Sequence, residues 1–478
     1  MRIEDLVKLI RECKIKGISC NSKTVKKGSV FVAVKGAKED GSRFIDQAIS
    51  KGAKIIVCKR GLRKKIKADV PLVEVKDTRL AIARLSAEFY ANPSKRLKVI
   101  GITGTNGKTT ITYILEAILK EAGLEPGVIG TVNYRFKGIV LPAKNTTPGP
   151  LELQSIMREM VKADVDYCAM EVSSHALEQE RVKGINFHSA IFTNLTQDHL
   201  DYHKTMGRYF LAKARLFKGL SSSSFAVLNY DDKYFSSLKR ITKVRVVTYG
   251  LKAGAQIRAT NIKYGLSSTE FLLSFPKGEL KMETHLIGRH NLYNLLAAFS
   301  WAHQEGIVLK DIKTALERFS FVPGRLEKIE CKKGFSVFVD YAHTDDALKN
   351  ILISLRALSP KRIITLFGCG GDRDKLKRPK MGKVATELSD FVVLTSDNPR
   401  SEKPEDIIKD IKSGIEKNNY SVLSDRKEAI KKVISMAIKG DILVIAGKGH
   451  ENYQVIGDNI IHFDDREEVR LCLKSQNY

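Results

Sequence analysis

The stretch KVIGITGTNGKTTITYILEAIL, residues 98–119, joins an apolar run to a helical pattern through a turn rich in glycine. The glycines of this turn allow backbone conformations in which several amide N–H groups face one anion, and the following helix adds its positive end. Lys108 stands where a P-loop lysine reaches the β- and γ-phosphates of a nucleotide, and Thr109 stands where a hydroxyl binds Mg²⁺. The sequence therefore predicts a strand, a phosphate-binding turn and a helix in succession.

The turn departs from the P-loop pattern G-x-x-x-x-G-K-[ST], because position 102 is Ile and the nearest glycine is Gly101. Its context still favours phosphate binding over a purely structural turn. The apolar side chains that follow recur at i, i+3, i+4, i+7 and i+8, which predicts the buried face of a helix. These side chains are Ile111, Ile114, Leu115, Ile118 and Leu119.

Short β-branched runs alternate with longer helical patterns along the chain, which is typical of parallel α/β sheets. The 478 residues exceed what one hydrophobic core usually supports, and the runs fall into three groups. We therefore predict three α/β domains, at residues 1–96, 97–325 and 326–478. The last group, with FSVFVDY, IITLFGC, FVVLTSD and ILVIAG as strands, is typical of a Rossmann-like domain.

The composition excludes several classes of protein. No apolar run approaches the ~20 residues of a membrane span, so we expect a soluble protein without membrane insertion. The first residues carry charges among their apolar positions, unlike a secretory signal. This pattern favours a location in the cytoplasm.

Seven dispersed cysteines without a C-x-x-C pair favour reduced thiols. The net charge of +27 attracts polyanions in general, but the lysines are dispersed, and we do not expect a nucleic acid as substrate.

A second apolar run, YCAMEV, contains Glu171 at its end. Beside a P-loop, a carboxylate at the end of a strand is expected to be an acidic ligand for the Mg²⁺ of a nucleotide. A helix N-cap or a solvated carboxylate is the alternative. We therefore expect Glu171 to serve the same ion as Thr109.

Several short motifs, in order from about Ser22 to Asp465, agree with one family. They are GTNGKTT, NTTP, EVSSHAL, TQDHLDYH, AKARLF, GRHNLYN, PGRLE, DYAHT, GCGGDRDKLKRPKM, DNPRSE and GKGHENYQ. The sequence resembles the Mur ligases, and among them those that add the third amino acid of the peptidoglycan peptide. The resemblance implies an N-terminal domain that binds a UDP-linked substrate, a central P-loop ATPase domain and a C-terminal Rossmann-like domain for the amino acid.

The resemblance implies an ATP-dependent, amide-forming ligase of peptidoglycan synthesis. Its substrates would be ATP, UDP-N-acetylmuramoyl-L-alanyl-D-glutamate and meso-diaminopimelate. A carboxylate is a poor electrophile, so the γ-phosphoryl group of ATP is first transferred to the side-chain carboxylate of D-glutamate. An amine then displaces phosphate from this acyl phosphate through a tetrahedral intermediate. A monomer that acts on small molecules is expected.

The negative charges that meet in this reaction require cations, and the resemblance implies two Mg²⁺ ions beside Lys108. Thr109 and Glu171 would serve one ion. His199 and Lys213 would serve the other, with Lys213 carbamylated by CO₂, because a carbamate turns an ammonium into a carboxylate-like anion. Without the motifs, His199 is a lone polar residue and Lys213 is a lysine on an amphipathic helix.

For ATP, the resemblance implies residues of the turn together with groups from later in the chain. They are Gly104, Thr105, Asn106, Gly107, Lys108, Thr109, Thr110, Asn291, Arg325 and Asp340, with His343 as a catalytic residue near the phosphates. Arg325 lies between the second and third predicted domains, where a guanidinium that meets phosphate only after closure would couple ATP binding to assembly of the site. An ordinary salt bridge between domains is the alternative.

For the UDP-linked acceptor, the resemblance implies hydroxyls, amides and one guanidinium, which suit phosphates and carboxylates. They are Ser22, Asn145, Thr146, Thr147, Ser173, Gln179 and Arg181. The chain has Asn21-Ser22-Lys23 where the family usually has Asp-Ser-Arg, so the surroundings of Ser22 depart from the pattern.

For the incoming amino acid, the resemblance implies Arg373, Asp397, Asn398, Pro399, Arg400, Gly447 and Glu451. meso-Diaminopimelate differs from L-lysine by a second carboxylate, which the Arg400 guanidinium can bind through two hydrogen bonds. With lysine, that guanidinium would be left unpaired. Glu451 is placed to accept a hydrogen bond from the distal ammonium. A further departure is Asp345, where the family commonly has Pro after Thr344.

Three alternatives stay open from the sequence. The ligase could use L-lysine or another diamino acid, or resemble folylpolyglutamate synthases, although the DNPR and NTTP segments argue against both. A nucleic-acid-dependent NTPase would account for the basic charge, but no stretch interleaves basic residues with stacking aromatic residues. A catalytically silent scaffold is disfavoured because Lys108, Glu171, His199 and Lys213 are present.

Overall fold

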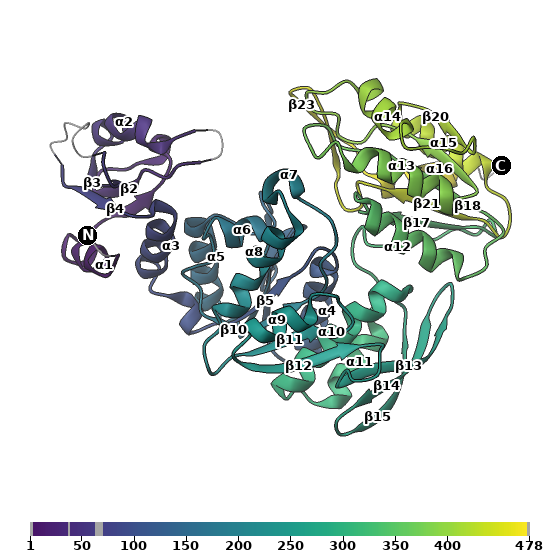
Figure 1. Cartoon of the computed structure of the whole chain (residues 1–478), viewed down its shortest axis with the longest axis horizontal. Coiled ribbons are helices and arrows are strands. Elements are labelled where there is room, and N and C mark those ends of the chain that lie inside the picture. The colour runs from purple at the N-terminus through teal and green to yellow at the C-terminus, as the bar shows by residue number, and fades with distance from the viewer. Residues whose placement is uncertain (1–2, 37–38, 63–69, 476–478) are drawn as a thin grey trace.

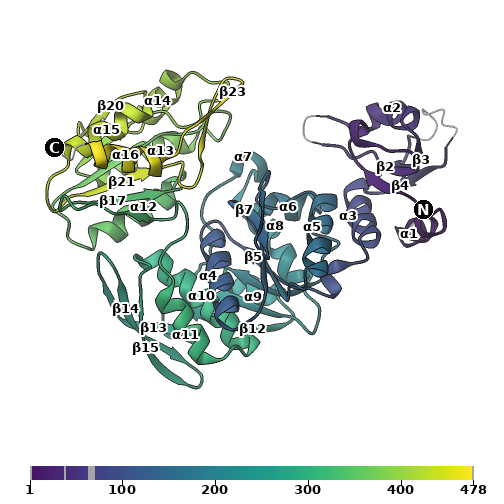
Figure 2. The ribbon, with the colours of Figure 1, turned by 180° about the vertical axis from the view of Figure 1, so that it is seen from behind.

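The computed structural model describes residues 3–36, 39–62 and 70–475. Within these residues the chain forms three lobes in succession. Figure 1, and Figure 2 from behind, show the purple N-terminal lobe, the teal central lobe and the yellow-green C-terminal lobe. The lobes are built on strands β1–β4, β5–β15 and β16–β21 respectively. The predicted three-part α/β fold is confirmed.

The N-terminal lobe is a parallel sheet in the order β1-β2-β3-β4 with helices packed against it. The strands are β1 (Gly17–Ser19), β2 (Ser29–Val32), β3 (Ala53–Lys59) and β4 (Leu72–Val75), and the helices are α1 (Ile3–Glu12), α2 (Ile45–Ser50) and α3 (Thr78–Phe89). Apolar side chains bury both faces of β3, so its sequence reads as a continuous hydrophobic run rather than an alternating one.

The central lobe has a sheet in the order β15-β14-β13-β12-β11-β10-β5-β9-β6-β7-β8. Its parallel strands are β5 (Lys98–Thr103), β6 (Pro126–Ile129), β9 (Tyr167–Glu171), β10 (Phe187–Phe192), β11 (Phe225–Asn229) and β12 (Arg245–Gly250). The sheet is extended at its edges by β7 (Asn133–Phe136), β8 (Ile139–Pro142), β13 (Ile257–Tyr264), β14 (Thr269–Phe275) and β15 (Gly278–Thr284). Antiparallel pairing in these extensions was not part of the sequence prediction.

Helices cover both faces of the central sheet and enclose two hydrophobic clusters. They are α4 (Lys108–Glu121), α5 (Pro150–Lys162), α6 (Ser174–Glu178), α7 (Leu200–His203), α8 (Met206–Lys218), α9 (Phe235–Ile241), α10 (Arg289–Glu305) and α11 (Leu309–Arg318). Helix α4 begins directly after the glycine-rich turn and packs against α10 and α11. The five apolar residues predicted on its buried face have no exposed surface, which confirms the helical periodicity.

The C-terminal lobe has a sheet in the order β16-β17-β21-β18-β19-β20, parallel except for β16. Its strands are β16 (Glu327–Ile329), β17 (Ser336–Asp340), β18 (Ile363–Phe367), β19 (Phe391–Leu394), β20 (Tyr420–Val422) and β21 (Ile442–Ala446). Its helices are α12 (Asp345–Arg356), α13 (Lys377–Leu388), α14 (Pro404–Lys412), α15 (Arg426–Met436) and α16 (Asp465–Ser475), and β22 (Tyr453–Ile456) pairs with β23 (Asn459–His462) as a hairpin.

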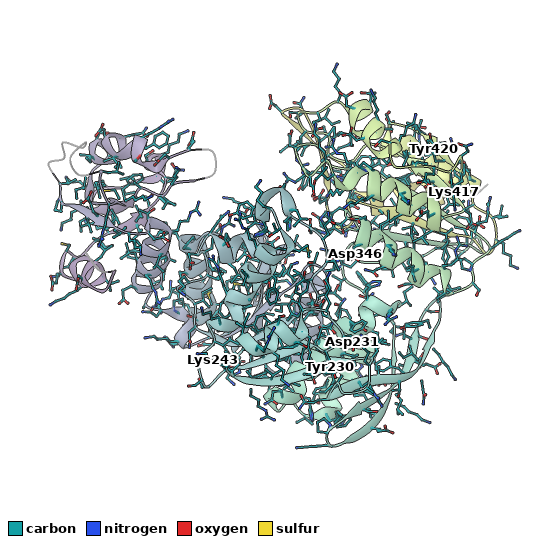
Figure 3. All side chains as sticks on the ribbon, in the orientation of Figure 1. Tyr230, Asp231, Lys243, Asp346, Lys417 and Tyr420 are labelled. Carbon is teal, nitrogen blue, oxygen red and sulfur yellow. The ribbon has the colours of Figure 1, made fainter. Side chains whose placement is uncertain are left out.

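Hydrogen bonds between side chains join the central and C-terminal lobes. Asn106 Nδ2 donates to Asp346 Oδ2 at 3.1 Å, and Lys380 Nζ donates to Gln197 Oε1 at 3.0 Å. Asp346, labelled in Figure 3, lies where α12 approaches the central lobe. In parallel α/β sheets, ligands bind outside the carboxyl ends of the strands. The contacts therefore bring the ligand-binding end of β5 toward that of β17.

All seven cysteines are free thiols. In the part of the chain that the structure describes, no helix is both long enough and apolar enough to cross a membrane.

Replacing Leu115 by Ala should lower the free energy of unfolding of the central lobe by about 2–5 kcal/mol, because it opens a cavity in a closely packed core. Leu115 and Trp301, the single tryptophan of the sequence, belong to the same buried cluster. Urea unfolding followed by tryptophan fluorescence therefore reports on this core. The control Lys120→Ala, at an exposed position of the same helix, should change stability by less than about 0.5 kcal/mol. Equal midpoints for both variants would contradict the packing described.

Candidate active site

The turn before α4 has the close backbone approaches that only glycine permits. Gly107 has φ +88°, and a Cβ at this residue would collide with Asn294 Oδ1. A Cβ at Gly104 would collide with the hydroxyl of Thr193, which donates to Asn106 O at 2.6 Å. The turn therefore packs against Thr193, which follows β10, and against Asn294 of α10, and helix α4 begins where the turn ends.

Two lysines converge on the carbonyl of Gly104. Lys108 Nζ donates to it at 2.9 Å and to Thr105 O at 2.7 Å, and Lys213 Nζ donates to it at 2.7 Å. Lys213 is 2% exposed, and burial followed by the neighbouring Lys108 holds its pKa well below the ordinary value of lysine. Burial also lowers the pKa of Lys108. Two buried lysines that share one acceptor are therefore poorly stabilised as ammonium ions, and a bound anion would offset that cost.

The hydroxyl of Thr109 connects Glu171 to Arg325. Thr109 Oγ1 donates to Glu171 Oε1 at 3.0 Å and accepts from an Arg325 guanidinium nitrogen at 3.2 Å. The other oxygen of Glu171 accepts from Thr131 Oγ1 at 3.0 Å. Thr109 and Glu171 are 4% and 1% exposed. The structure thus brings together the predicted hydroxyl and carboxylate, and adds Thr131, for which the sequence carried no signal.

His199 and Lys213 approach the same aromatic ring. Lys213 Nζ lies 4.5 Å from the centre of the Tyr209 ring, and the His199 ring centre lies 6.2 Å from it. His199 has φ +53° and stands 3.4 Å from Asp198 Oδ2. Burial is the main cause of a lowered His199 pKa, which favours the neutral imidazole that a metal requires. Asp198 belongs to TQDHLDYH but was not among the predicted site residues.

In the described residues, no group of three or more His, Cys, Asp or Glu side chains is arranged to hold a metal ion. This agrees with the chemistry of Mg²⁺ at nucleotides, where one or two protein ligands are completed by waters and phosphates. Thr109 and Glu171 fit such an ion. A buried lysine with a lowered pKa also fits carbamate formation, because the neutral amine is the form that attacks CO₂.

The other predicted ATP-binding residues of the central lobe lie around the turn. Thr105 Oγ1 donates to Thr196 O at 3.2 Å, the Asn106 amide donates to Asn194 Oδ1 at 3.0 Å, and Thr110 is buried in the first turn of α4. The Asn291 side chain lies on α10 and accepts from Asn294 at 3.2 Å. Asn294 also faces Gly107, so Asn291 is connected to the turn through the side chain of Asn294.

The C-terminal lobe contributes Arg325, Asp340 and His343. The two carboxylate oxygens of Asp340 accept from the backbone amides of Leu326 and Ala342, and burial raises its pKa to about 6. His343 Nδ1 lies 2.9 Å from Tyr341 O, and burial lowers its pKa to about 4. Asp340 therefore ties the end of β17 to the backbone directly before β16.

Six predicted acceptor-binding residues form one cluster beside Glu171. Thr147 Oγ1 donates to Glu171 O at 2.8 Å and accepts from the Ser173 amide at 3.0 Å. Arg181 donates to Thr147 O at 2.9 Å and to Gln179 Oε1 at 2.8 Å. Thr146 Oγ1 lies 3.1 Å from Thr131 Oγ1, and Asn145 O accepts from the Tyr134 hydroxyl at 2.6 Å.

Ser22 lies apart from this cluster, in the N-terminal lobe. It is 5% exposed, and its hydroxyl donates to Gln47 Oε1 at 2.6 Å. Asn21, one of the residues that depart from the family pattern, accepts from the Lys23 amide as an N-cap. The predicted acceptor residues are thus divided between two lobes.

The predicted amino-acid residues gather where β19 and β21 end. Asn398 Nδ2 donates to Glu451 Oε2 at 2.8 Å, and Arg400 donates to Gly371 O at 2.7 Å. A Cβ at Gly447 would lie 3.0 Å from Asp397 Oδ2, and a Cβ at Gly371 would collide with Pro399 O. Arg373 flanks Gly370 opposite the Arg400 guanidinium and donates to Asp372 O.

The charges of this pocket are unevenly paired. Arg400 has φ +54°, its guanidinium donates to carbonyl oxygens, and among the described residues it forms no ion pair. Asp397 Oδ1 is buried without a hydrogen-bond partner. Burial is the main cause of a raised Glu451 pKa, with Asp397 adding to it. Within the described residues, the pocket therefore offers a guanidinium without an ion pair and one carboxylate oxygen, Asp397 Oδ1, without a hydrogen-bond donor.

Arg325 and Tyr341 connect the two ends of the site. The Arg325 guanidinium lies 4.6 Å from the centre of the Tyr341 ring, and the Tyr341 hydroxyl donates to Glu451 at 3.4 Å. Arg325 also reaches Thr109 beside the glycine-rich turn. Tyr341 was not predicted, although DYAHT places it next to Asp340.

Comparison with known proteins agrees with this arrangement. Models of the Mur ligase middle domain, the Mur ligase glutamate ligase domain and the Mur ligase family catalytic domain match residues 102–302, 324–449 and 14–90. The chain is 44% identical, over 466 residues, to the UDP-N-acetylmuramoyl-L-alanyl-D-glutamate--2,6-diaminopimelate ligase of Clostridium tetani, covering 97% of this chain and 96% of the relative. The chain belongs to the Mur ligase family. Mur ligases use ATP to form amide bonds.

Solved structures resemble this Mur ligase over nearly its whole length. One of a UDP-N-acetylmuramoyl-L-alanyl-D-glutamate--2,6-diaminopimelate ligase superposes with a TM-score of 0.70 at 34% identity, covering 97% of this chain and 96% of the other. The MurF ligase from Thermotoga maritima in complex with ADP superposes with a TM-score of 0.65 at 21% identity, covering 96% and 97%. The second likeness shows the shared fold.

Proposed function

We propose that this Mur ligase adds meso-diaminopimelate to UDP-N-acetylmuramoyl-L-alanyl-D-glutamate at the expense of ATP. The observation that carries the proposal is the charge pattern of the amino-acid pocket. The Arg400 guanidinium, which forms no ion pair with the described residues, stands near two acceptors, the buried Asp397 and the half-buried Glu451. This pattern suits a substrate end that bears both a carboxylate and an ammonium. The name of the Clostridium tetani relative supports the same substrate.

The reaction begins with transfer of the γ-phosphoryl group of ATP to the side-chain carboxylate of D-glutamate, which forms an acyl phosphate and releases ADP. The turn amides and Lys108 hold the β- and γ-phosphates, and their positive charge lowers the repulsion between phosphate and carboxylate. The amine of meso-diaminopimelate then attacks the acyl phosphate, an amide bond forms and phosphate leaves. The chain's part is to position three substrates and to exclude water, which would otherwise hydrolyse the acyl phosphate.

Thr109 and Glu171 would hold one Mg²⁺, and His199 together with a carbamate on Lys213 would hold a second. Bound Mg²⁺ supplies positive charge at the transferred phosphoryl group. The lowered pKa of Lys213 supports this assignment, because it makes the neutral amine available to CO₂. We assign His343, which lies close enough to Asp198 for each to shift the pKa of the other, to the phosphates.

We assign the base and ribose of ATP to Asn291, Arg325 and Asp340. Arg325 already donates to Thr109, so binding of a triphosphate there would exchange a neutral partner for an anionic one.

The cluster around Thr147 and Arg181 would hold the acceptor next to Glu171, while Ser22 would contact the same acceptor from the N-terminal lobe.

We further propose that the enzyme works in the cytoplasm, as a monomer, on small molecules and not on nucleic acid. Its three predicted domains, residues 1–96, 97–325 and 326–478, would serve the UDP-linked acceptor, ATP and the amino acid in that order.

Phosphate release by the purified protein tests the function. With ATP, Mg²⁺ and the UDP-linked dipeptide present, release should depend on the amino acid, with meso-diaminopimelate favoured over L-lysine by about 10²-fold or more in kcat/KM. The Arg400 guanidinium is the reason, since lysine lacks the second carboxylate that would pair with it, and a half-buried charge without its partner disfavours that substrate. Mass spectrometry should detect the tripeptide product. Absence of product, or an equal rate with lysine, would refute the proposal.

Lys213→Ala should reduce kcat by about 10³-fold or more, because the anionic group for the second ion is lost. Short carboxylates such as formate or acetate should restore part of the activity by occupying the space of the carbamate. The measurement is kcat with and without these additives, beside Lys218→Ala on the same helix as control. Wild-type activity of Lys213→Ala without additive would exclude the assigned role.

Arg400→Ala should raise the KM for meso-diaminopimelate by about 10²-fold and leave the KM for ATP within about twofold, because one charged contact to the substrate is removed. The KM of Arg400→Lys for meso-diaminopimelate should lie between those of the wild type and Arg400→Ala, since an ammonium cannot form the paired hydrogen bonds of a guanidinium. Steady-state kinetics with each substrate varied in turn decides the matter. An unchanged KM for meso-diaminopimelate would remove Arg400 from the pocket.

A further inference from the structure

Lys448 is a fully buried lysine inside the amino-acid pocket. It follows β21, between Gly447 and Gly449, which have φ +115° and +53°. Its side chain has no exposed surface. Lysine is seldom buried to this extent unless it is paired, so its surroundings indicate what the ammonium does.

The Lys448 ammonium meets acceptors from three segments. It donates to Asn398 Oδ1 at 3.3 Å and to the backbone oxygen of Tyr453. Glu451 Oε2 lies 3.6 Å from Nζ, and Asp397 Oδ1 lies 3.8 Å away. Asn398 in turn donates to the same oxygen of Glu451 at 2.8 Å. The ammonium, Asn398 and Glu451 therefore form a closed ring of contacts.

The position of this ammonium between two carboxylates has an electrostatic consequence. The residue Asp397 is 6% exposed and the side chain of Glu451 is 14% exposed. Their negative charges repel each other. A fixed cation between them offsets the repulsion. It leaves Asp397 Oδ1, which lacks a hydrogen-bond partner, free to receive a donor from outside the chain.

We propose that Lys448 is a positioning residue of the amino-acid pocket, whose buried ammonium holds Asn398 and Glu451 in the arrangement that receives the ammonium of the diamino acid. This inference rests on the proposed function. It assigns Lys448 no contact with the reacting atoms. Its effect on catalysis passes through Glu451, which must be ionised to accept from a substrate ammonium.

Loss of the Lys448 charge should therefore change how binding depends on pH. Burial and Asp397 already raise the pKa of Glu451, while Lys448 opposes that rise. Without Lys448 the Glu451 pKa rises further, so more Glu451 is protonated near neutral pH and substrate binding improves as the pH increases. The other charged or titratable groups that face Glu451 are Asp397, Arg400, Arg426, Tyr341 and Tyr453.

The test compares the KM values for meso-diaminopimelate and ATP between pH 6.5 and 9 in the full-length wild type and in Lys448→Met. At pH 7 the variant should show a KM for meso-diaminopimelate at least about tenfold higher, as expected when a buried charge loses its partner. This excess should shrink as the pH rises. The KM for ATP should stay within about twofold.

Two further variants make the result specific. Lys383→Met removes an exposed lysine that also faces two glutamates, Glu387 and Glu416, and it should behave as the wild type. Lys448→Arg keeps the charge, so it should retain the wild-type pH profile even with a raised KM for meso-diaminopimelate. If Lys448→Met does not melt cooperatively, this arginine variant decides: a wild-type pH profile supports the inference, and a displaced pH profile despite the retained charge overturns it.

The outcomes separate this inference from the proposed function. An active wild type with a folded Lys448→Met that keeps the wild-type KM and pH profile overturns the role of Lys448 alone. An equal rise in both KM values indicates general damage to the lobe and also overturns it. A wild type that yields no tripeptide refutes the proposed function, and this inference with it.

Discussion

One guanidinium, that of Arg325, touches both ends of the site. On one side it donates to the Thr109 hydroxyl beside the glycine-rich turn, and on the other it covers the ring of Tyr341, whose hydroxyl reaches Glu451. The order of the sheets makes this possible, because β5 and β17 present their carboxyl ends where the central and C-terminal lobes meet. A site with this geometry cannot be assembled within either lobe alone.

Several ionisable side chains of the site are only partly compensated by groups of opposite charge. Lys108 and Lys213 share one carbonyl oxygen, and burial lowers the pKa of each. Burial raises the pKa of Asp340 and Glu451. Elsewhere in the C-terminal lobe, the buried charges of Arg426 and Asp465 pair directly, at 2.7 Å. Several groups with shifted pKa values therefore lie where phosphates and an amino acid would bind, which is common at functional sites.

Local pattern predicted the parallel strands, the turn and the buried face of α4, because each depends on the spacing of a few neighbouring residues. The edge strands β13–β15 were not predicted, because their alternating and partly exposed faces give a weaker hydrophobic pattern in the sequence than the buried parallel strands do. The motifs predicted Glu171, His199, Lys213 and Arg400 as site residues. Thr131 and Tyr341 were missed, because their contacts with Glu171 and Glu451 join residues 40 or more positions apart in the sequence. Asp198 was missed although it lies in TQDHLDYH, directly before His199.

The two side-chain hydrogen bonds that join Asn106 to Asp346 and Lys380 to Gln197 are polar contacts of moderate strength. Interfaces of this kind open more readily than a hydrophobic core does. Ile287, in the segment before α10, nevertheless belongs to the hydrophobic cluster of the C-terminal lobe, so the two lobes also share an apolar contact. Parting the lobes would expose that side chain to water, and the contact therefore favours the arrangement in which the ends of β5 and β17 face each other.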